Sequence, residues 1–182
     1  MGRATMLLIM IVALLLFIAA PAVAKNGFSL GFNMLFNDVS GGINTSENLE
    51  SGNGLGLHGG FGFNQYLSIE VGVWKTNHSD KLGGKPADLE AGTLDLKVNL
   101  PLAGSHIEPY LLVGVGSYTL EQQGISEDGK GGRFGLGMDI YLFPDISFNV
   151  GITRNSVTFT HNSVNMDGKI TTMDFGITYH FI

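Results

Sequence analysis

One short segment of the chain carries side chains that could hydrolyse an ester. In His161-Asn162-Ser163 a histidine stands two residues before a serine, and a histidine that takes the serine proton makes the hydroxyl a nucleophile. A carboxylate to orient the histidine has no candidate beyond Asp167 and Asp174. A polar hairpin tip explains the same residues more simply, so we expect no catalytic residue and no enzyme.

Side chains that bind metal ions are present but are not spaced to do so. The five histidines (58, 78, 106, 161 and 180) show no metal-ligand spacing. The chain has no cysteine, which excludes thiolate sites and disulfides. Glu127-Asp128-Gly129 lacks the oxygen-ligand spacing of a calcium loop. We therefore expect no metal and no cofactor, and we expect His58 and His180 to point inward as satisfied interior residues.

The elements that must position these residues are strands. Beyond residue 24 the chain is a series of segments in which large apolar residues alternate with small, polar or charged ones, and this period of two is typical of β-strands. The predicted strands are residues 28–36, 54–63, 67–74, 93–100, 107–118, 133–142, 146–153 and 172–181.

The composition of the two strand faces favours a barrel in lipid over a soluble sandwich. One face is large, apolar and nearly free of charge over about ten residues, the length of a membrane strand. The other face mixes charges, aromatics and glycine, and the chain has 27 glycines in 182 residues. Small residues fit a narrow interior that large ones enter from across it. We expect Gly54, Gly56, Gly60 and Gly62 to make room for Trp74, Tyr110, Tyr118 and Tyr141.

Charged residues on the second face would form an ion-pair network inside the barrel. Five acids and two bases share that face, and pairing the third and fourth strands about the middle of their loop brings Glu70 beside Lys97. Eight strands leave an interior just wide enough for side chains, so we expect a plugged lumen; a cation-lined pore is the alternative. The predicted network comprises Glu70, Asp95, Lys97, Glu108, Arg133, Asp139 and Asp174.

The connections between strands alternate in length. Residues 64–66, 101–106 and 143–145 are short, whereas 38–52, 77–89, 119–131 and 155–168 are long and polar. Short periplasmic turns and long outer loops are typical of outer-membrane barrels. The predicted fold is therefore an all-β, eight-stranded, antiparallel, up-and-down transmembrane barrel with both ends on the periplasmic side.

The first 24 residues have the pattern of a cleaved signal peptide. Arg3 precedes an apolar run of 14 residues, Leu7 to Ala20, and Ala22-Val23-Ala24 follows as a cleavage pattern. We expect residues 1–24 to be removed on export through the inner membrane, leaving 25–182 as the barrel domain. Nine basic residues then stand against sixteen acidic ones, a formal charge of −7 that argues against a nucleic-acid partner.

Three segments carry a family resemblance. Residues 108–116 (EPYLLVGVG), 135–141 (GLGMDIY) and 175–181 (FGITYHF) resemble the small outer-membrane β-barrel family of the OmpX and OmpA transmembrane-domain type. The resemblance implies a location in the outer membrane of a Gram-negative cell. Its partners would be outer-membrane lipid, lipopolysaccharide and the outer-membrane assembly machinery. The last segment resembles the signal that this machinery reads, through Phe175, Ile177, Tyr179 and Phe181.

Three functions are compatible with such a barrel. The first is a structural or surface-interaction role, in which the outer loops bind a ligand that the sequence does not identify. The second is a narrow channel for small solutes, similar to OmpW. The third is a hydrolase that modifies lipid A, because His161-Asn162-Ser163 resembles at one point the His-x-Ser pair of barrel deacylases. Val164 stands where that family has an asparagine directly after the serine.

Overall fold

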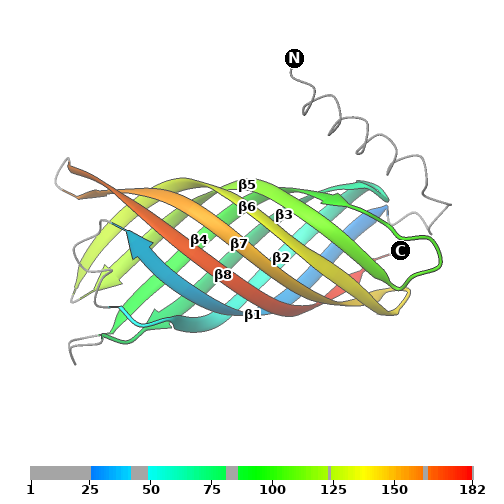
Figure 1. Ribbon diagram of the computed structural model, residues 1–182, viewed down its shortest axis with the longest axis horizontal. Coiled ribbons are helices and arrows are strands. Elements are labelled where there is room, and N and C mark those ends of the chain that lie inside the picture. The colour runs from blue at the N-terminus through cyan, green and yellow to red at the C-terminus, as the bar shows by residue number, and fades with distance from the viewer. Residues whose placement is uncertain (1–25, 42–48, 81–85, 123, 162–163, 182) are drawn as a thin grey trace, which may run out of the picture.

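The computed structural model describes residues 26–41, 49–80, 86–122, 124–161 and 164–181. In this part of the chain eight strands follow one another around a closed barrel, each antiparallel to its neighbours (Figure 1). No helix within these ranges is long and apolar enough to cross a membrane. The strands are β1 (Gly27–Gly41), β2 (Gly52–Asn64), β3 (Leu67–His78), β4 (Ala87–Asn99), β5 (Ile107–Gln122), β6 (Ile125–Phe143), β7 (Ile146–His161) and β8 (Val164–His180).

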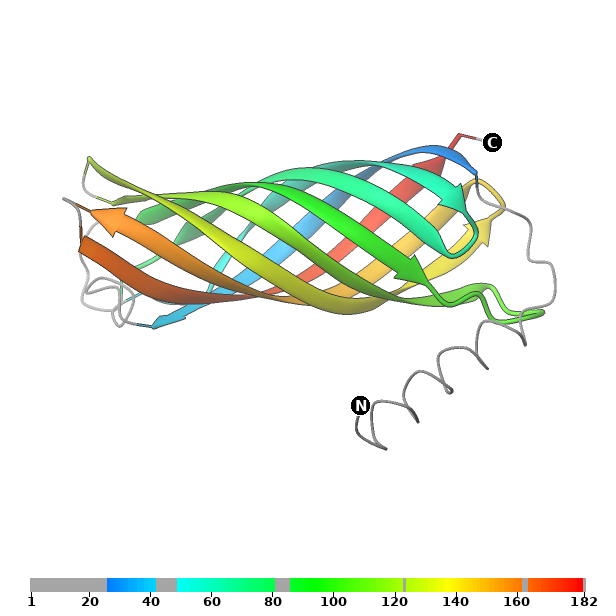
Figure 2. The same ribbon diagram turned by 90° about the horizontal axis from the view of Figure 1, so that it is seen from above.

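The barrel is closed by the pairing of the first strand with the last. Ser29 lies opposite His180 and Gly41 opposite Gly168, and the Phe181 amide donates to the Phe28 carbonyl oxygen at 2.8 Å. β1 begins and β8 ends at the same end of the barrel (Figure 2), as the even strand number predicts. Closure leaves no unpaired strand edge, which is the condition for β-structure in lipid.

Three tight connections lie at the end where the chain enters and leaves, which we call the inner end. The β2–β3 turn is held by Asn64, whose side-chain oxygen accepts from the amides of Tyr66 and Leu67 at 2.8 and 2.9 Å. Asparagine is favoured in turns because it makes such bonds to its own backbone. Gly104, in the β4–β5 connection, has a φ of 72°, a conformation that glycine adopts without strain. The predicted short turns are therefore confirmed.

The strands are longer at the opposite, outer end than the sequence predicts. Two of the predicted long loops, residues 119–131 and 155–168, are mostly strand: β5 runs to Gln122 and β6 begins at Ile125, while β7 runs to His161 and β8 begins at Val164. β3 and β4 likewise extend to His78 and back to Ala87. The predicted boundaries were wrong here because the segments contain many polar residues, which face water rather than forming loops.

Side-chain polarity reverses along the strands. In the inner part the outward-facing side chains are apolar, as in Phe148, Val150 and Ile152 of β7. Beyond Arg154 the outward-facing residues of the same strand are polar, and the inward-facing ones, Val157 and Phe159, are buried apolar residues. The first arrangement is that of a membrane barrel and the second that of a water-soluble one, so the barrel extends beyond the membrane at its outer end.

Aromatic residues ring the inner end of the apolar band. Phe28 and Phe61 lie edge to face with ring centroids 5.0 Å apart, Phe61 packs on Phe63 at 5.5 Å, and Tyr179 packs on Phe181 at 4.9 Å. Aromatic girdles mark the membrane interfaces of outer-membrane barrels. This end of the apolar band therefore lies at one membrane interface.

Candidate functional site

The inner half of the lumen is built around Lys97. This side chain projects from β4 and is 11% exposed; its Nζ lies 3.2 Å from Glu70 Oε1 and 2.9 Å from Asp139 Oδ2. It also lies 4.1 Å from the centroid of the Tyr110 ring. One cation thus joins carboxylates of β3 and β6 across the interior, and it is held over the negative face of an aromatic ring.

The contact between Lys97 and Glu70 forms in a register different from the predicted one. Glu70 lies opposite Asp95, and Lys97 lies opposite Ser68, two residues along β4. The lysine therefore reaches Glu70 diagonally, which its long side chain allows. The sequence prediction was right about the contact and wrong by two residues about the pairing of β3 with β4.

A second ion pair lies beside the first. Arg133 Nε of β6 is 3.1 Å from Asp95 Oδ1 of β4, and both side chains are nearly buried. Neither of these atoms has a hydrogen-bond partner, so the contact is ionic without the alignment of a hydrogen bond. Asp174 accepts from Asn33 Nδ2 at 3.3 Å, and buried Glu108 lies opposite Asp139 in the β5–β6 ladder. All seven predicted network residues belong to strands of the barrel.

Inward-facing histidines bind hydroxyl groups. His58 Nε2 lies 3.0 Å from Thr178 Oγ1, and His180 Nε2 lies 3.0 Å from Ser147 Oγ. Nearer the outer end, His78 contacts Thr76 Oγ1 at 3.1 Å and the Glu50 carbonyl oxygen at 3.0 Å. Within the described ranges no three His, Cys, Asp or Glu residues group closely enough to hold a metal ion.

An apolar cluster fills the outer half of the lumen, and we call it the plug. Tyr118 is 1% exposed, Leu89, Phe159 and Ile170 are each 0% exposed, and Trp74 packs on Tyr118 with ring centroids 6.0 Å apart. Trp74 and Tyr118 were predicted to be interior residues, but the plug as a whole was not predicted, because most of its residues, such as Leu89 and Phe159, lie in segments predicted as loops. The alternation Val157-Thr158-Phe159-Thr160 is the signal that could have found it. The plug comprises Leu35, Val39, Leu49, Trp74, Ala87, Leu89, Ala91, Tyr118, Leu120, Val157, Phe159 and Ile170.

A small polar cavity lies where the plug meets the ion pairs. Its volume is about 70 Å³, and its lining includes Trp74 and Leu35 of the plug as well as Lys97 and Arg133. A cavity of this size has room for only a few water molecules. The lumen of the described barrel is therefore filled by side chains at both levels, with a small polar cavity between them.

Glycines make room for the large interior residues, but not all of them are the predicted ones. A Cβ on Gly56 would lie 2.9 Å from the Trp74 Cβ, which agrees with the prediction for this pair. Tyr118 is instead accommodated by Gly116, and Tyr110 by Gly137 and Gly151, where an added Cβ would lie 2.5–2.8 Å from the phenol oxygens. Gly60 faces Ser29 and Glu70. The assignment from sequence failed because it depended on strand register.

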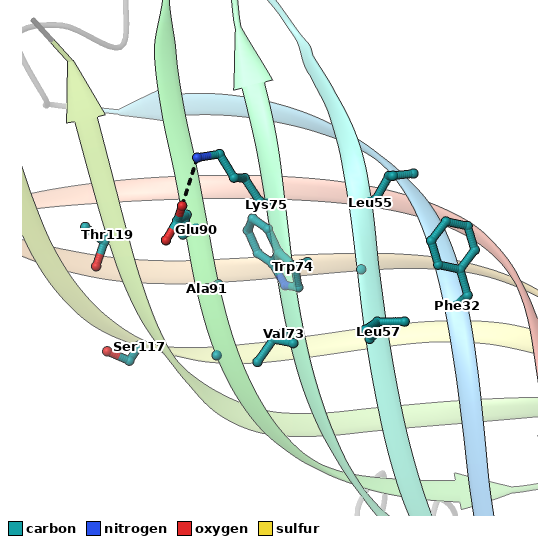
Figure 3. A pocket seen from close by; sticks show the side chains of 12 residues that line it. Phe32, Leu55, Leu57, Val73, Trp74, Lys75, Glu90, Ala91, Ser117 and Thr119 are labelled. Carbon is teal, nitrogen blue, oxygen red and sulfur yellow. Dashed lines mark hydrogen bonds and ion pairs between the residues drawn. The ribbon is translucent and has the colours of Figure 1, made fainter.

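The outer wall carries an open groove of about 610 Å³ across β1 to β5 (Figure 3). Phe32, Leu55, Leu57 and Val73 line it, and outward-facing Gly92 leaves a gap with no heavy atom within 4 Å of an added Cβ. Lys75 stands at its rim, and its Nζ lies 2.9 Å from both Asp88 and Glu90. The groove belongs to the lipid-facing wall, and the cation above it is neutralised within the protein.

Three other groups of residues stand out in the sequence: a candidate catalytic pair, an assembly signal and an acidic segment considered for calcium. Asn162 and Ser163 fall outside the described residues, so the predicted His161–Ser163 pair is untested. The predicted assembly-signal residues Phe175, Ile177, Tyr179 and Phe181 share the outward, lipid-facing side of the last strand and its C-terminal extension. Asp128 of the rejected calcium segment accepts from Thr119 Oγ1 at 2.9 Å.

The closed barrel, apolar outside and charged inside, defines a membrane-spanning β-barrel. The chain matches the outer membrane protein beta-barrel domain family over residues 10–181. It belongs to this family, and the predicted family and fold are confirmed. Membership implies a location in the outer membrane.

Several solved structures share the fold at low sequence identity. Neisserial surface protein A matches with a TM-score of 0.70 and 14% identity, covering 88% of this chain and 100% of that one. Ail of Yersinia pestis matches with a TM-score of 0.57 and 16% identity, covering 86% and 99%. OprG of Pseudomonas aeruginosa matches with a TM-score of 0.54 and 19% identity, covering 86% and 97%. Comparison with curated protein sequences finds no match.

Proposed function

We propose that this protein is a non-conducting outer-membrane barrel with a structural or surface-interaction role. The plug supports the proposal, because Leu89, Phe159 and Ile170 are fully buried across the outer half of the lumen. A solute would also have to pass Lys97, which bridges Glu70 and Asp139. Side chains at both levels of the described lumen therefore support a barrel that does not conduct.

The polar extension supports the surface role. Strands as long as the 19 residues of β6 raise a water-compatible outer wall above the apolar band. A simple membrane anchor would not need strands of this length, since a membrane strand takes about 9–11 residues. The ligand would contact this outer wall or the hairpin tips.

Planar-bilayer conductance tests the proposal against a narrow channel. The purified full chain should give no steady single-channel steps in potassium chloride, and a porin reconstituted in parallel verifies the bilayer. Reproducible steps from the intact protein would favour the channel, with cation selectivity expected because five interior acids outnumber two bases.

The third function considered is a lipid A hydrolase, and we propose that the protein lacks this activity. Ser163→Ala should leave the acyl pattern of lipid A unchanged in cells that express the protein, as seen by mass spectrometry. His161→Gln is the companion variant. A deacylated species present with the original chain and lost in both variants would make His161 and Ser163 a catalytic pair.

For export and assembly we propose the route that the family resemblance implies. We propose that residues 1–24 are removed during export, which intact mass and N-terminal sequencing of the barrel would test by finding Lys25 first. Outer-membrane lipid and lipopolysaccharide would surround the band, and the assembly machinery would read Phe175, Ile177, Tyr179 and Phe181. Phe181→Ala should lower the folded yield in cells more than it lowers stability after refolding in vitro.

A further inference from the structure

Three cations stand together on the outer wall, on the opposite side of the barrel from Lys75. They are Lys130 of β6, Arg154 of β7 and Lys169 of β8, and all three are exposed. Ser156 lies among them. Lys169 is directly opposite Ser156 across the β7–β8 ladder, and Arg154 is the next outward residue of β7 toward the membrane. Lys130 lies diagonally from Ser156 on β6. Directly paired side chains in a sheet are about 5 Å apart and diagonal ones about 7–8 Å, so the three cations surround one hydroxyl.

The centre of this cluster is a shallow notch. Gly132 lies opposite Ser156 on β6, and a Cβ placed there would meet nothing closer than a backbone oxygen at 4.0 Å. The β6 residue directly opposite Ser156 therefore has no side chain to cover its hydroxyl. A tetrahedral anion seated over Gly132 would have a hydroxyl beneath it and cationic side chains around it.

None of the three cations forms an ion pair with a described residue. The ammonium and guanidinium groups of Lys130, Arg154 and Lys169 make no hydrogen bond to a described residue; the Ser40 hydroxyl donates to the backbone carbonyl oxygen of Lys169, which leaves its ammonium group available. The acids next to Lys169 and Lys130 accept hydrogen bonds from hydroxyl groups instead: Asp167 from Thr158 Oγ1 and Asp128 from Thr119 Oγ1, both at 2.9 Å. Asp38 of β1 lies beyond Thr171 in the row of Arg154 and diagonally from Lys169, but it forms no ion pair with either cation. On the opposite wall Lys75 contacts two carboxylates, one of which Figure 3 shows.

The cluster lies at the upper edge of the apolar band. On β7 the next outward-facing residue beyond Ile152 toward the outer end is Arg154. On β6 the next one beyond Phe134 in the same direction is Gly132. Phe134 is 56% exposed and lies directly opposite Arg154. A ligand held by the cations would thus continue downward onto an apolar wall, which is the layout of a lipid with a phosphorylated headgroup.

We propose that Lys130, Arg154 and Lys169, with Ser156 and the Gly132 notch, bind the phosphate of an outer-leaflet phosphorylated glycolipid whose acyl chains lie along Phe134 and Ile152. Guanidinium and ammonium groups form strong charge-assisted hydrogen bonds with phosphate oxygens. The site rests on the proposed orientation, in which the outer end of the barrel faces away from the cell. Conduction through the lumen is a separate property, so the two proposals fail independently.

Native mass spectrometry of the folded full chain in detergent, titrated with diphosphoryl lipid A, measures this binding. The triple variant Lys130→Gln, Arg154→Gln, Lys169→Gln should bind about tenfold or more weakly, because each lost charge-assisted hydrogen bond weakens binding several-fold. Arg154→Gln alone should weaken binding, and Arg154→Lys should restore part of it. Lys75→Gln removes one outward cation from the opposite wall and should leave the affinity unchanged.

Two further arms separate the lipid from other ligands. Dephosphorylated lipid A should not distinguish the triple variant from the original chain, and millimolar inorganic phosphate should not displace the lipid. Equal binding by the triple variant, equal loss in Lys75→Gln, or full displacement by inorganic phosphate would each overturn the lipid site. A heat-modifiability gel on every variant confirms that the barrel is folded, which is expected because the substituted side chains are exposed.

Discussion

At the scale of single residues, Lys97 holds the interior charges together. Its Nζ contacts carboxylates from two strands that are not neighbours in the sheet, Glu70 of β3 and Asp139 of β6. A buried pair of this kind adds little net stability by itself, because both charges lose their hydration. Removing one partner is different, since the other charge then stays buried without compensation.

Lys97→Met should destabilise the barrel by about 3–5 kcal/mol, because it leaves two buried carboxylates without their cation. Urea unfolding in lipid vesicles measures the change. Adding Asp139→Asn to the variant should cost less than the sum of the two single changes, since residues in contact couple. Strict additivity would show that the contact does not matter.

Lys75→Met is the control for this experiment. Lys75 also contacts two carboxylates, at 2.9 Å each, but its side chain is 49% exposed. Exposed ion pairs contribute about 0–1 kcal/mol, so the control should unfold almost like the original chain.

Gly137 and Gly92 test whether the interior is packed as tightly as the contacts suggest. A Cβ on Gly137 would overlap the Val150 carbonyl oxygen and the Tyr110 ring, whereas a Cβ on Gly92 would meet nothing within 4 Å. Gly137→Ala should therefore lower the free energy of unfolding by about 1–3 kcal/mol through overpacking. Gly92→Ala should change it by less than about 0.5 kcal/mol. Equal effects would mean that the lumen has free space.

At the scale of the elements, the sequence predicted the inner ends of the strands better than the outer ends. The strands that begin at Leu67, Ile107 and Ile146 begin where predicted, because large apolar side chains face lipid there and turn residues precede them. The outer ends of β5 to β8 were assigned to loops. Their outward residues are polar, and their apolar residues point inward, so a search for apolar outward faces does not detect them.

The interior site was partly predictable for a related reason. Strand alternation places Lys97, Glu70 and Asp139 inside whatever the register, so the composition of the network follows from the pattern. Which charges touch depends on register. The Arg133–Asp95 pair and the contact of Lys97 with Asp139 came from the observed pairing, because a shift of two residues keeps the face but changes the partners.

One strand allows the reversal of polarity to be tested directly. Val150 faces lipid in the middle of β7, opposite Met138 and Phe175, and Val150→Arg should cost about 2–4 kcal/mol in lipid. Thr158, outward on the same strand, lies between Lys130 and Asp167. Thr158→Arg should change stability by no more than about 0.5 kcal/mol, since it is an exposed surface position. Similar losses at both positions would place the membrane boundary further out than Arg154.

At the scale of the whole molecule, the barrel has an inner and an outer part that share one continuous sheet. The inner part is apolar outside and charged inside, and the outer part is polar outside and contains the apolar plug. Continuous ladders join them, such as the β7–β8 pairs from Ile146–Tyr179 to His161–Val164. The plug gives the outer part an apolar core in water, and in the proposed function the same packing closes the lumen from outside.

Access to a single cysteine tests the closure independently of conductance. The chain has no cysteine, so Thr153→Cys provides one reporter at a position that is 5% exposed and lines the polar cavity beneath the plug. A cationic, membrane-impermeant thiol reagent added from outside should label it far more slowly than Thr160→Cys, which is exposed on the outer wall. Adding Leu89→Ala and Phe159→Ala removes two fully buried plug side chains, and labelling of Thr153→Cys should then accelerate while that of Thr160→Cys stays constant. Rapid labelling of Thr153→Cys in the intact barrel would mean that water reaches the cavity past the plug. If the two alanines left the rate unchanged although the barrel stayed folded, the closure would lie elsewhere, and the apolar cluster would serve stability alone.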